Sequence, residues 1–231
     1  CAKHVFLVTD PRRLEATVRT AFEIARTGRP GAGVLGNPND REEAQVPFMG
    51  RGVLPVPGFR ARQRALEDNR LSDEQCERFF EMLSRARRPL LYCGGGVIYG
   101  EAAGALREFA QAFGIPAVTT LMGIGSYDTT EPLGLHMLGM HGTAFANYAV
   151  DDCDFLIADG ARFDDRLAGV PAKFARSAKF IAHLDVDSAE INKVKRVQWH
   201  HVGLPAPALE ALTRFGRRQE FAKDLTPWHE H

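Results

Sequence analysis

The chain has 231 residues, of which 45% are hydrophobic and 25% are charged, a composition typical of a globular protein with a sizeable core. Its 29 basic residues balance 29 acidic ones, so no net charge favours nucleic acid or an anionic membrane. The widely spaced cysteines argue against a structural zinc and fit free thiols in a reducing compartment; they are Cys1, Cys76, Cys93 and Cys153. We expect neither a membrane span nor a signal peptide.

The first predicted element is a helix that starts at Asp10, where Asp10 can cap it and Pro11 can occupy its first position. Apolar residues then recur on one face until Gly28: Leu14, Val18, Phe22 and Ala25. Residues 41–69 are rich in charge, glycine and proline and have no sustained period. We predict an irregular linker there.

The second half alternates helices with strands. Ser72 and Gln75 form a capping box before a helix that runs through Arg85. The patterns after it predict a strand at 90–93, a helix at 101–113, and strands at 117–120, 155–158 and 180–184. Such alternation predicts an α/β fold, in which a parallel sheet is flanked by helices on both faces.

Glycine-rich turns follow two of these strands, at Gly94 to Gly96 and at Gly160. In parallel sheets ligands bind outside the carboxyl ends of the strands, and glycine lets a pyrophosphate or a ring approach the main chain. The spacing is not GxGxxG, so a tight strand-to-helix turn explains the first group equally well. Asp185 closes another strand and could accept hydrogen bonds from a ribose or adenine, or cap the next helix.

The motif GARFDDR, residues 160–166, is the most specific candidate site. An arginine fork suits a carboxylate or phosphate, and the two aspartates could orient it; a solvated local ion pair is the simpler alternative. We predict no metal here, because no His or Glu lies at ligand spacing. His136 and His141 are poorly spaced for zinc and favour packing or stacking. Their apolar neighbours suit either the core or a flat aromatic ring; these are Met137, Leu138 and Met140.

Taken together, several motifs resemble acetohydroxyacid synthase, or acetolactate synthase, a thiamine-diphosphate enzyme family of branched-chain amino-acid biosynthesis. They are TGRPG, LLYCGGG, TTLMGIGSY, LHMLGMHGTAFANYAV, GARFDDR and HLDVDSAEINK. The resemblance runs almost end to end but covers only the middle of that enzyme. It implies a Rossmann-like central domain that binds FAD in a chiefly structural role. The activating glutamate and the GDG…N diphosphate motif of the family do not occur in this sequence.

The resemblance divides the chain into four parts. They are the end of an N-terminal pyrimidine-binding-type domain (1–40), a linker (41–70), the central FAD-binding domain (71–205), and a C-terminal helix and linker toward a diphosphate-binding domain (206–231). Because the opening Cys1 replaces a methionine, we expect the chain to belong to something longer. Alone, it is expected to be inactive.

Carried over position by position, the family's cofactor contacts fall along the whole chain. The residues implied for FAD are Arg29, Gly95, Thr120, Leu121, Leu138, Gly139, Met140, His141, Gly160, Ala161, Arg162, Phe163, Asp164, Asp185 and Val186. Arg166, with Asp165 beside it, matches the arginine that holds the carboxylate of the second 2-oxo acid. No catalytic residue and no metal ligand is expected within this chain.

Some positions depart from the family pattern. Ala32, Gly36 and Asn39 stand where a proline, an aspartate and a lysine near the substrate channel are usual, which puts a channel role in doubt. Leu204 replaces an aspartate, so an adenosine contact is in doubt there.

The leading hypothesis is therefore the FAD-binding central portion of an acetolactate synthase, a magnesium-dependent transferase that condenses two pyruvates, or pyruvate and 2-oxobutyrate, with loss of CO₂. A non-catalytic nucleotide-binding module of the same descent is the alternative, and an oxidoreductase is disfavoured because GxGxxG is absent. The family implies 2-oxo acid substrates, a homo-oligomer, a regulatory subunit, and a cytoplasmic or plastid location. We expect neither nucleic acid nor membrane as a partner.

Overall fold

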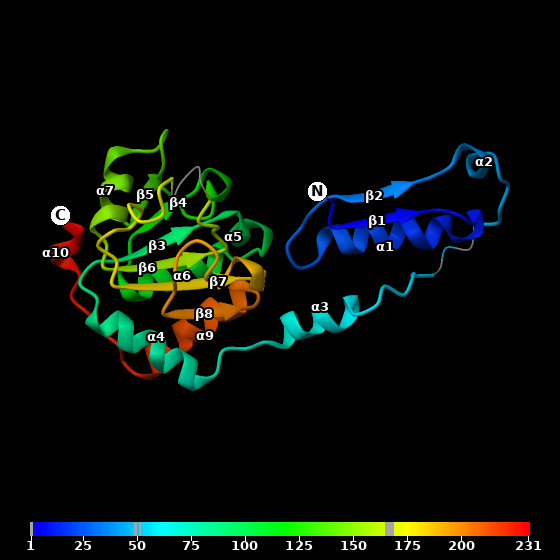
Figure 1. The fold of residues 1–231 in the computed structure, drawn as a ribbon. Coiled ribbons are helices and arrows are strands. Elements are labelled where there is room, and N and C mark those ends of the chain that lie inside the picture. The colour runs from blue at the N-terminus through cyan, green and yellow to red at the C-terminus, as the bar shows by residue number, and fades with distance from the viewer. Residues whose placement is uncertain (1, 49, 51, 165–168) are drawn as a thin grey trace. The chain divides into compact units, whose positions relative to one another are not determined.

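The computed structural model describes residues 2–48, 50, 52–164 and 169–231. It divides into two compact units, Cys1–Leu66 and Glu67–His231 (Figure 1). The division falls within a helix, α3 (Phe59–Asp68). The region predicted as an irregular linker therefore contains a helix in its second half.

The first unit is a pair of parallel strands with one helix against them. β1 (His4–Leu7) pairs with β2 (Gly33–Gly36), and the chain between them forms the 3-10 turn η1 (Pro11–Arg13) and α1 (Leu14–Arg26). Asp10 caps this turn, because its carboxylate accepts a hydrogen bond of 3.0 Å from the N–H of Arg12. The predicted helix start is thus confirmed, whereas neither strand was predicted. A short helix, α2 (Asn39–Glu42), follows β2.

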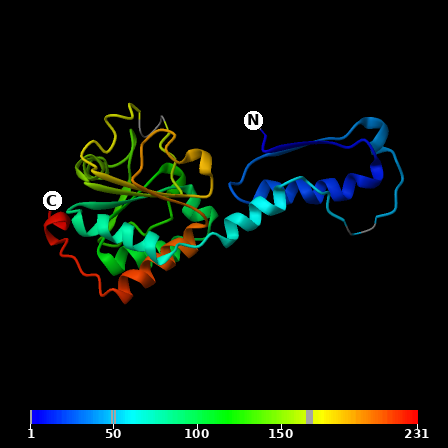
Figure 2. The same cartoon turned by 60° about the horizontal axis from the view of Figure 1, so that its bottom comes forward.

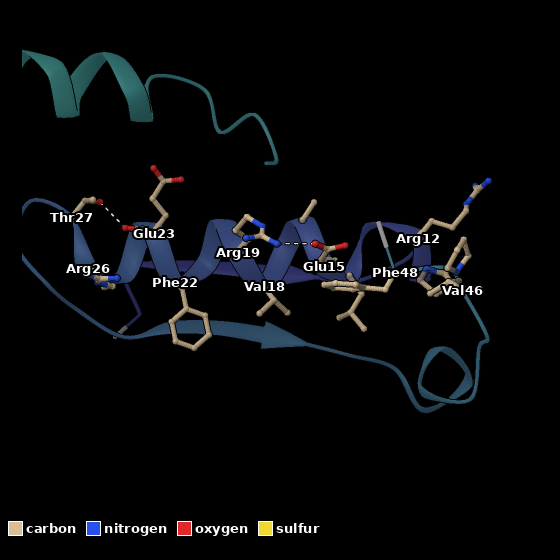
Figure 3. Close-up of a pocket in the computed structure, with 14 residues that line it drawn as sticks. Arg12, Glu15, Val18, Arg19, Phe22, Glu23, Arg26, Thr27, Val46 and Phe48 are labelled. Carbon is tan, nitrogen blue, oxygen red and sulfur yellow. Dashed lines mark hydrogen bonds and ion pairs between the residues drawn. The ribbon is translucent and has the colours of Figure 1, made fainter. Parts of the chain in front are cut away.

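The face that α1 buries differs from the predicted one. The buried residues of the helix are Thr17, Thr20 and Ile24, whereas Phe22 is 67% exposed. Val18 and Phe22 line a groove of about 960 Å³ along the outer side of α1, together with Val46 and Phe48 (Figure 3). The predicted face is wrong because the two strands cover only one side of α1. The stripe of larger apolar side chains lies on the opposite side of the helix.

The second unit contains a six-stranded parallel sheet with the order β5-β4-β3-β6-β7-β8 (Figure 1). Its strands are β3 (Pro89–Cys93), β4 (Ala117–Thr119), β5 (Gly134–Met137), β6 (Phe155–Asp159), β7 (Phe180–Asp185) and β8 (Trp199–Val202). The two central strands, β3 and β6, are buried along their whole length. The four strands predicted from the sequence are present, and the two outer ones, β5 and β8, were missed.

Helices cover both faces of this sheet, which confirms the predicted α/β class. One face carries α4 (Asp73–Arg85), α5 (Gly95–Tyr99), α6 (Ala103–Phe113) and α9 (Pro205–Arg218). α4 and α9 are distant in sequence but lie side by side (Figure 2), with the rings of Phe80 and Phe215 stacked at 5.6 Å. The other face carries α7 (Ala144–Asp152) and the C-terminal α10 (Thr226–His229).

Local signals account for several helix ends. The capping box of Ser72 and Gln75 is present at the start of α4, which ends at Arg85 as predicted. α6 ends at Gly114, whose left-handed backbone (φ 65°) favours glycine. The C-terminal residues belong to the same unit, because Trp228 is buried in the core and its indole N–H donates to the carbonyl of Pro89 (2.9 Å).

Candidate functional site

The order of the strands creates a topological switch point between β3 and β6. From β3 the chain moves outward to β4 and β5, and then returns to the centre at β6 and moves the other way to β7 and β8. In open parallel sheets the crevice outside the carboxyl ends of the strands at such a point is the usual ligand site. We call the segments that follow the strands there the carboxyl edge: residues 94–96, 120–123, 138–142, 160–164 and 185–187.

Three glycines meet at the switch point. The N–H of Gly96 donates to the carbonyl of Gly160 (2.9 Å), and that of Gly94 donates to the carbonyl of Asp159 (2.9 Å). A Cβ on Gly94 would lie 2.1 Å from the oxygen of Gly160, and one on Gly96 would lie 2.6 Å from its Cα. Backbone packing between two loops therefore explains these glycines without a ligand, which is a reason other than the tight strand-to-helix turn considered from the sequence.

Gly95 differs from its two neighbours. A Cβ there would lie 3.1 Å from the side chain and the carbonyl oxygen of Met122, in the turn η2 (Leu121–Gly123) after β4. The Thr120 hydroxyl caps that turn by accepting from the N–H of Gly123 (3.0 Å), so this side chain already has a structural task. Leu121 is 68% exposed. A side chain at position 95 would therefore crowd Met122 in the turn that carries the exposed Leu121.

The segment after β5 combines a fixed backbone with two exposed side chains. Asn147 of α7 both donates to the carbonyl of Gly139 (3.0 Å) and accepts from its N–H (2.9 Å). Leu138 is buried in the core, so its side chain is not available to a ligand, whereas Met140 is 83% exposed. His141 is also exposed.

The described part of GARFDDR alternates between the core and the surface. Ala161 and Phe163 are buried, and the hydroxyl of Tyr92 fixes the segment by donating to the carbonyl of Arg162 (2.9 Å). The Arg162 guanidinium lies 3.8 Å from the carboxylate of Asp164. This is the local ion pair of the simpler interpretation, and it also leaves an arginine at the ligand edge. Asp165 and Arg166 lie outside the described residues.

At the end of β7 the carboxylate of Asp185 accepts from the N–H of Asp187 (2.8 Å). The cap of the next turn, η3 (Ser188–Glu190), is Asp187, which accepts from the N–H of Ala189 (3.0 Å). Asp185 is therefore not the helix cap. Behind it lies the buried His183, whose Nε2 is 3.0 Å from the carbonyl of Ala161, and the partly buried Val186 follows.

The family model for the central domain of thiamine pyrophosphate enzymes matches residues 76–212, which include the whole sheet from β3 to β8. The chain belongs to the thiamine pyrophosphate enzyme family. The predicted relation to thiamine-diphosphate enzymes is thereby confirmed, and the six-stranded parallel sheet agrees with it.

Known relatives narrow the comparison to one branch of the thiamine pyrophosphate enzymes. The chain is 39% identical to acetolactate synthase 2, chloroplastic, of Nicotiana tabacum, over 99% of this chain and 34% of that protein. It is 44% identical to the acetolactate synthase of Arthrospira platensis (83% of this chain, 33% of that protein). It is also 39% identical to the acetolactate synthase large subunit of Corynebacterium glutamicum, over 98% of this chain and 35% of that protein. The chain spans about a third of the length of these relatives.

Arg29, expected to contact FAD, and the positions that depart from the family pattern near the substrate channel lie in the first unit, so their roles stay predictions. Arg29 follows α1, Ala32 and Gly36 lie before and in β2, and Asn39 begins α2. In the second unit, Leu204 precedes α9 and makes no side-chain cap.

One buried acid at the site was not predicted from the sequence: Asp159, the last residue of β6. The side chain is 0% exposed, and neither carboxylate oxygen has a hydrogen-bond partner among the described residues. Burial raises its pKa to about 7, with a further contribution from the charge of Asp185. The sequence does carry a signal for this buried acid, because Asp159 ends the otherwise apolar strand sequence FLIAD.

The His, Cys, Asp and Glu side chains of the described residues form no group of three or more that could hold a metal ion. Among the described helices, none has the length and hydropathy of a membrane span.

Proposed function

We propose that this chain is the FAD-binding central portion of an acetolactate synthase. The observation that carries the proposal is the switch point between β3 and β6, a standard site for nucleotide cofactors in parallel sheets, in a chain homologous to acetolactate synthases over nearly its whole length. The relatives are about three times as long, so the activity of a complete enzyme is proposed for the protein to which this segment corresponds.

The carboxyl edge has the chemistry that FAD requires. Exposed Leu121 and Met140 offer apolar surface to a flat isoalloxazine ring, and the lack of a side chain on Gly95 lets the turn that carries Leu121 pack closely at this edge. Arg162 can pair with a pyrophosphate, and Asp185 can accept from ribose hydroxyls. The Arg162 side chain is 52% exposed and its distance to Asp164 is long at 3.8 Å, so this ion pair costs little to rearrange.

The substrate side of the proposal rests on the family resemblance. Arg166, with Asp165 beside it, would bind the carboxylate of the second 2-oxo acid and orient its ketone. Thiamine diphosphate and Mg²⁺ supply the carbanion chemistry in such enzymes, and the segments that hold them do not occur in this sequence. The role of this chain in the complete enzyme is accordingly to bind FAD and to position the substrate. The complete enzyme would be a homo-oligomer with a regulatory subunit, located in the cytoplasm or a plastid.

An FAD titration tests the proposal. The purified chain should quench FAD fluorescence in a saturable way, and Gly95→Val should weaken the affinity at least about tenfold, because the new side chain collides with Met122 and displaces the turn that carries Leu121. Gly104→Val is the matched control, since a Cβ there meets no atom within 4 Å. A folded chain that does not bind FAD would refute the cofactor assignment.

A second assay separates the catalytic parent from a non-catalytic nucleotide-binding module. With thiamine diphosphate, Mg²⁺ and pyruvate, the chain alone should form no acetolactate, because the activating glutamate is absent from it. Replacing the corresponding third of a related acetolactate synthase with this chain should give a hybrid enzyme that retains activity. An inactive but folded and FAD-loaded hybrid would favour the non-catalytic alternative.

A further inference from the structure

Asp159 ends the central strand β6, directly beneath the contact between the glycine loops. Its register neighbours are Cys93 on β3 and Leu184 on β7, which both belong to the core on the face covered by α5, α6 and α9. Side chains alternate along a strand, so Asp159 shares this face with Ile157, two residues before it. The carboxyl group is therefore part of an apolar core.

Nothing described around the carboxyl group compensates a negative charge. Both oxygens lack hydrogen-bond partners among the described residues. β3 contributes the Cys93 thiol, whose own pKa is raised by burial and by Asp159, and α5 contributes the apolar Val97. The charge of Asp185 at the end of β7 further disfavours ionisation, whereas the buried His183 lies with its register partner Ala158 on the opposite face of the sheet. β8, one strand further, contributes the buried His201, the register partner of Leu184. The neutral acid is the form that this environment favours.

The main chain links Asp159 to the ligand edge without any intervening group. The carbonyl of Asp159 accepts from the N–H of Gly94, and Gly160, the next residue, holds Gly96 through its own carbonyl. A charge that develops on Asp159 would therefore lie one residue away from the backbone at the switch point, where the low dielectric of the core strengthens its field.

We propose that Asp159 is a proton-controlled element beneath the switch point: an anionic ligand binds at the carboxyl edge while this carboxyl group is neutral, and binding weakens when the group ionises. The identity of the ligand as FAD rests on the proposed function. The electrostatic argument requires only a ligand that carries negative charge, such as a pyrophosphate.

Linkage fixes the sign of the effect. A bound anion disfavours a second negative charge nearby, so it raises the pKa of Asp159 above the value of about 7 that the free protein has. Affinity is therefore highest below pH 7 and falls as the pH rises through 7. If the bound anion raises the pKa by about one pH unit, the affinity falls about tenfold.

The test is an FAD titration at several pH values between about 5.5 and 8.5, a range in which the pyrophosphate of FAD stays fully ionised. We expect the affinity of the unmodified chain to fall about tenfold across this range. Asp159→Asn should bind like the unmodified chain at the acidic end and lose the pH dependence. Glu74→Gln, which removes an exposed carboxylate on α4, should leave the pH profile unchanged.

Carboxyl ¹³C NMR of the unmodified chain tests the same element even if Asp159→Asn does not fold. The Asp159 signal should titrate near pH 7 and move to higher pH with FAD. An Asp159 that titrates near pH 4, or an Asp159→Asn variant that keeps the pH profile through His183 or His201, would overturn the inference. If FAD does not bind at any pH, the proposed function fails. Sulfate then replaces FAD as the anionic probe, and its binding is measured from the amide chemical shifts of Gly95 and Gly160. Sulfate affinity that does not fall with rising pH would then overturn the inference as well.

Discussion

Gly96 and Gly104 show that the fold requires glycine at one helical position and tolerates a side chain at another. A Cβ at position 96 would lie 2.6 Å from the Cα of Gly160, which is backbone and cannot move aside, whereas at position 104 it would meet no atom within 4 Å. Both residues lie in helices, α5 and α6. The difference between them therefore comes from tertiary packing.

We expect Gly96→Ala to lower the free energy of unfolding by about 2 kcal/mol or more, because the two loops at the switch point must separate. Gly104→Ala should raise it by about 0.5–1 kcal/mol, because alanine loses less backbone entropy in a helix. Urea denaturation followed by circular dichroism measures both. Equal effects of the two substitutions would contradict the close contact between Gly96 and Gly160.

Asp159 should make stability depend on pH. Its pKa is about 7 in the folded chain and is taken as the usual 3.8 in the unfolded one, so between these values only the folded state keeps the proton. The free energy of unfolding should therefore fall as the pH rises from about 4 to about 7, by up to about 4 kcal/mol, and then level off. In Asp159→Asn this contribution should vanish, as urea midpoints at pH 4 and pH 8 would show. A variant that follows the wild-type curve would exclude Asp159 as the cause.

At the scale of elements, the C-terminal helix α10 closes one face of the sheet although it is only four residues long. It does so through Trp228, which packs in the core cluster of α7 and donates a hydrogen bond to Pro89 at the start of β3. The N-terminal end of a central strand is thereby joined to the last residues of the chain.

Trp228→Ala should lower the free energy of unfolding by about 3–5 kcal/mol, because it leaves a cavity and an unpaired carbonyl. Trp228→Phe keeps most of the apolar volume and should cost clearly less. Thermal unfolding of both variants is the measurement. If truncation to alanine changed the midpoint no more than phenylalanine does, α10 would not be part of the core.

At the scale of the whole molecule, the two units differ in how completely they bury their apolar residues. In the first unit, the buried residues among those described are Val8, Thr17, Thr20 and Ile24, and the groove along α1 exposes Phe22 (Figure 3). The second unit has a complete parallel sheet with a core on each face. Two strands and one helix rarely bury enough surface to be stable in water.

Residues 67–231 should therefore fold by themselves, with a cooperative thermal transition and dispersed amide NMR signals. Residues 1–66 alone should remain largely unfolded. Circular dichroism and NMR of the two separate polypeptides give the answer. A cooperatively folded 1–66 would show that the exposed face of α1 needs no further layer.

The sequence by itself determined the features that depend on neighbours within a few residues. Asp10 and the pair Ser72 and Gln75 fix helix starts through hydrogen bonds over two or three residues, and continuous apolar runs identify the buried strands β3 and β6. Together with the motifs, these signals sufficed for the fold class and the family. The short outer strands β5 and β8 lack such runs, so only pairing with β4 and β7 reveals them.

Tertiary structure alone decided what distant residues do to one another. The order of the strands placed the switch point between β3 and β6, and the small first sheet decided which face of α1 is buried. The fold of the second unit also packs Gly94 and Gly96 against the Gly160 loop and surrounds Asp159 with apolar core. Burial and like-charge contacts depend on three-dimensional distance, because a carboxyl group has an ordinary pKa until the fold removes the water around it.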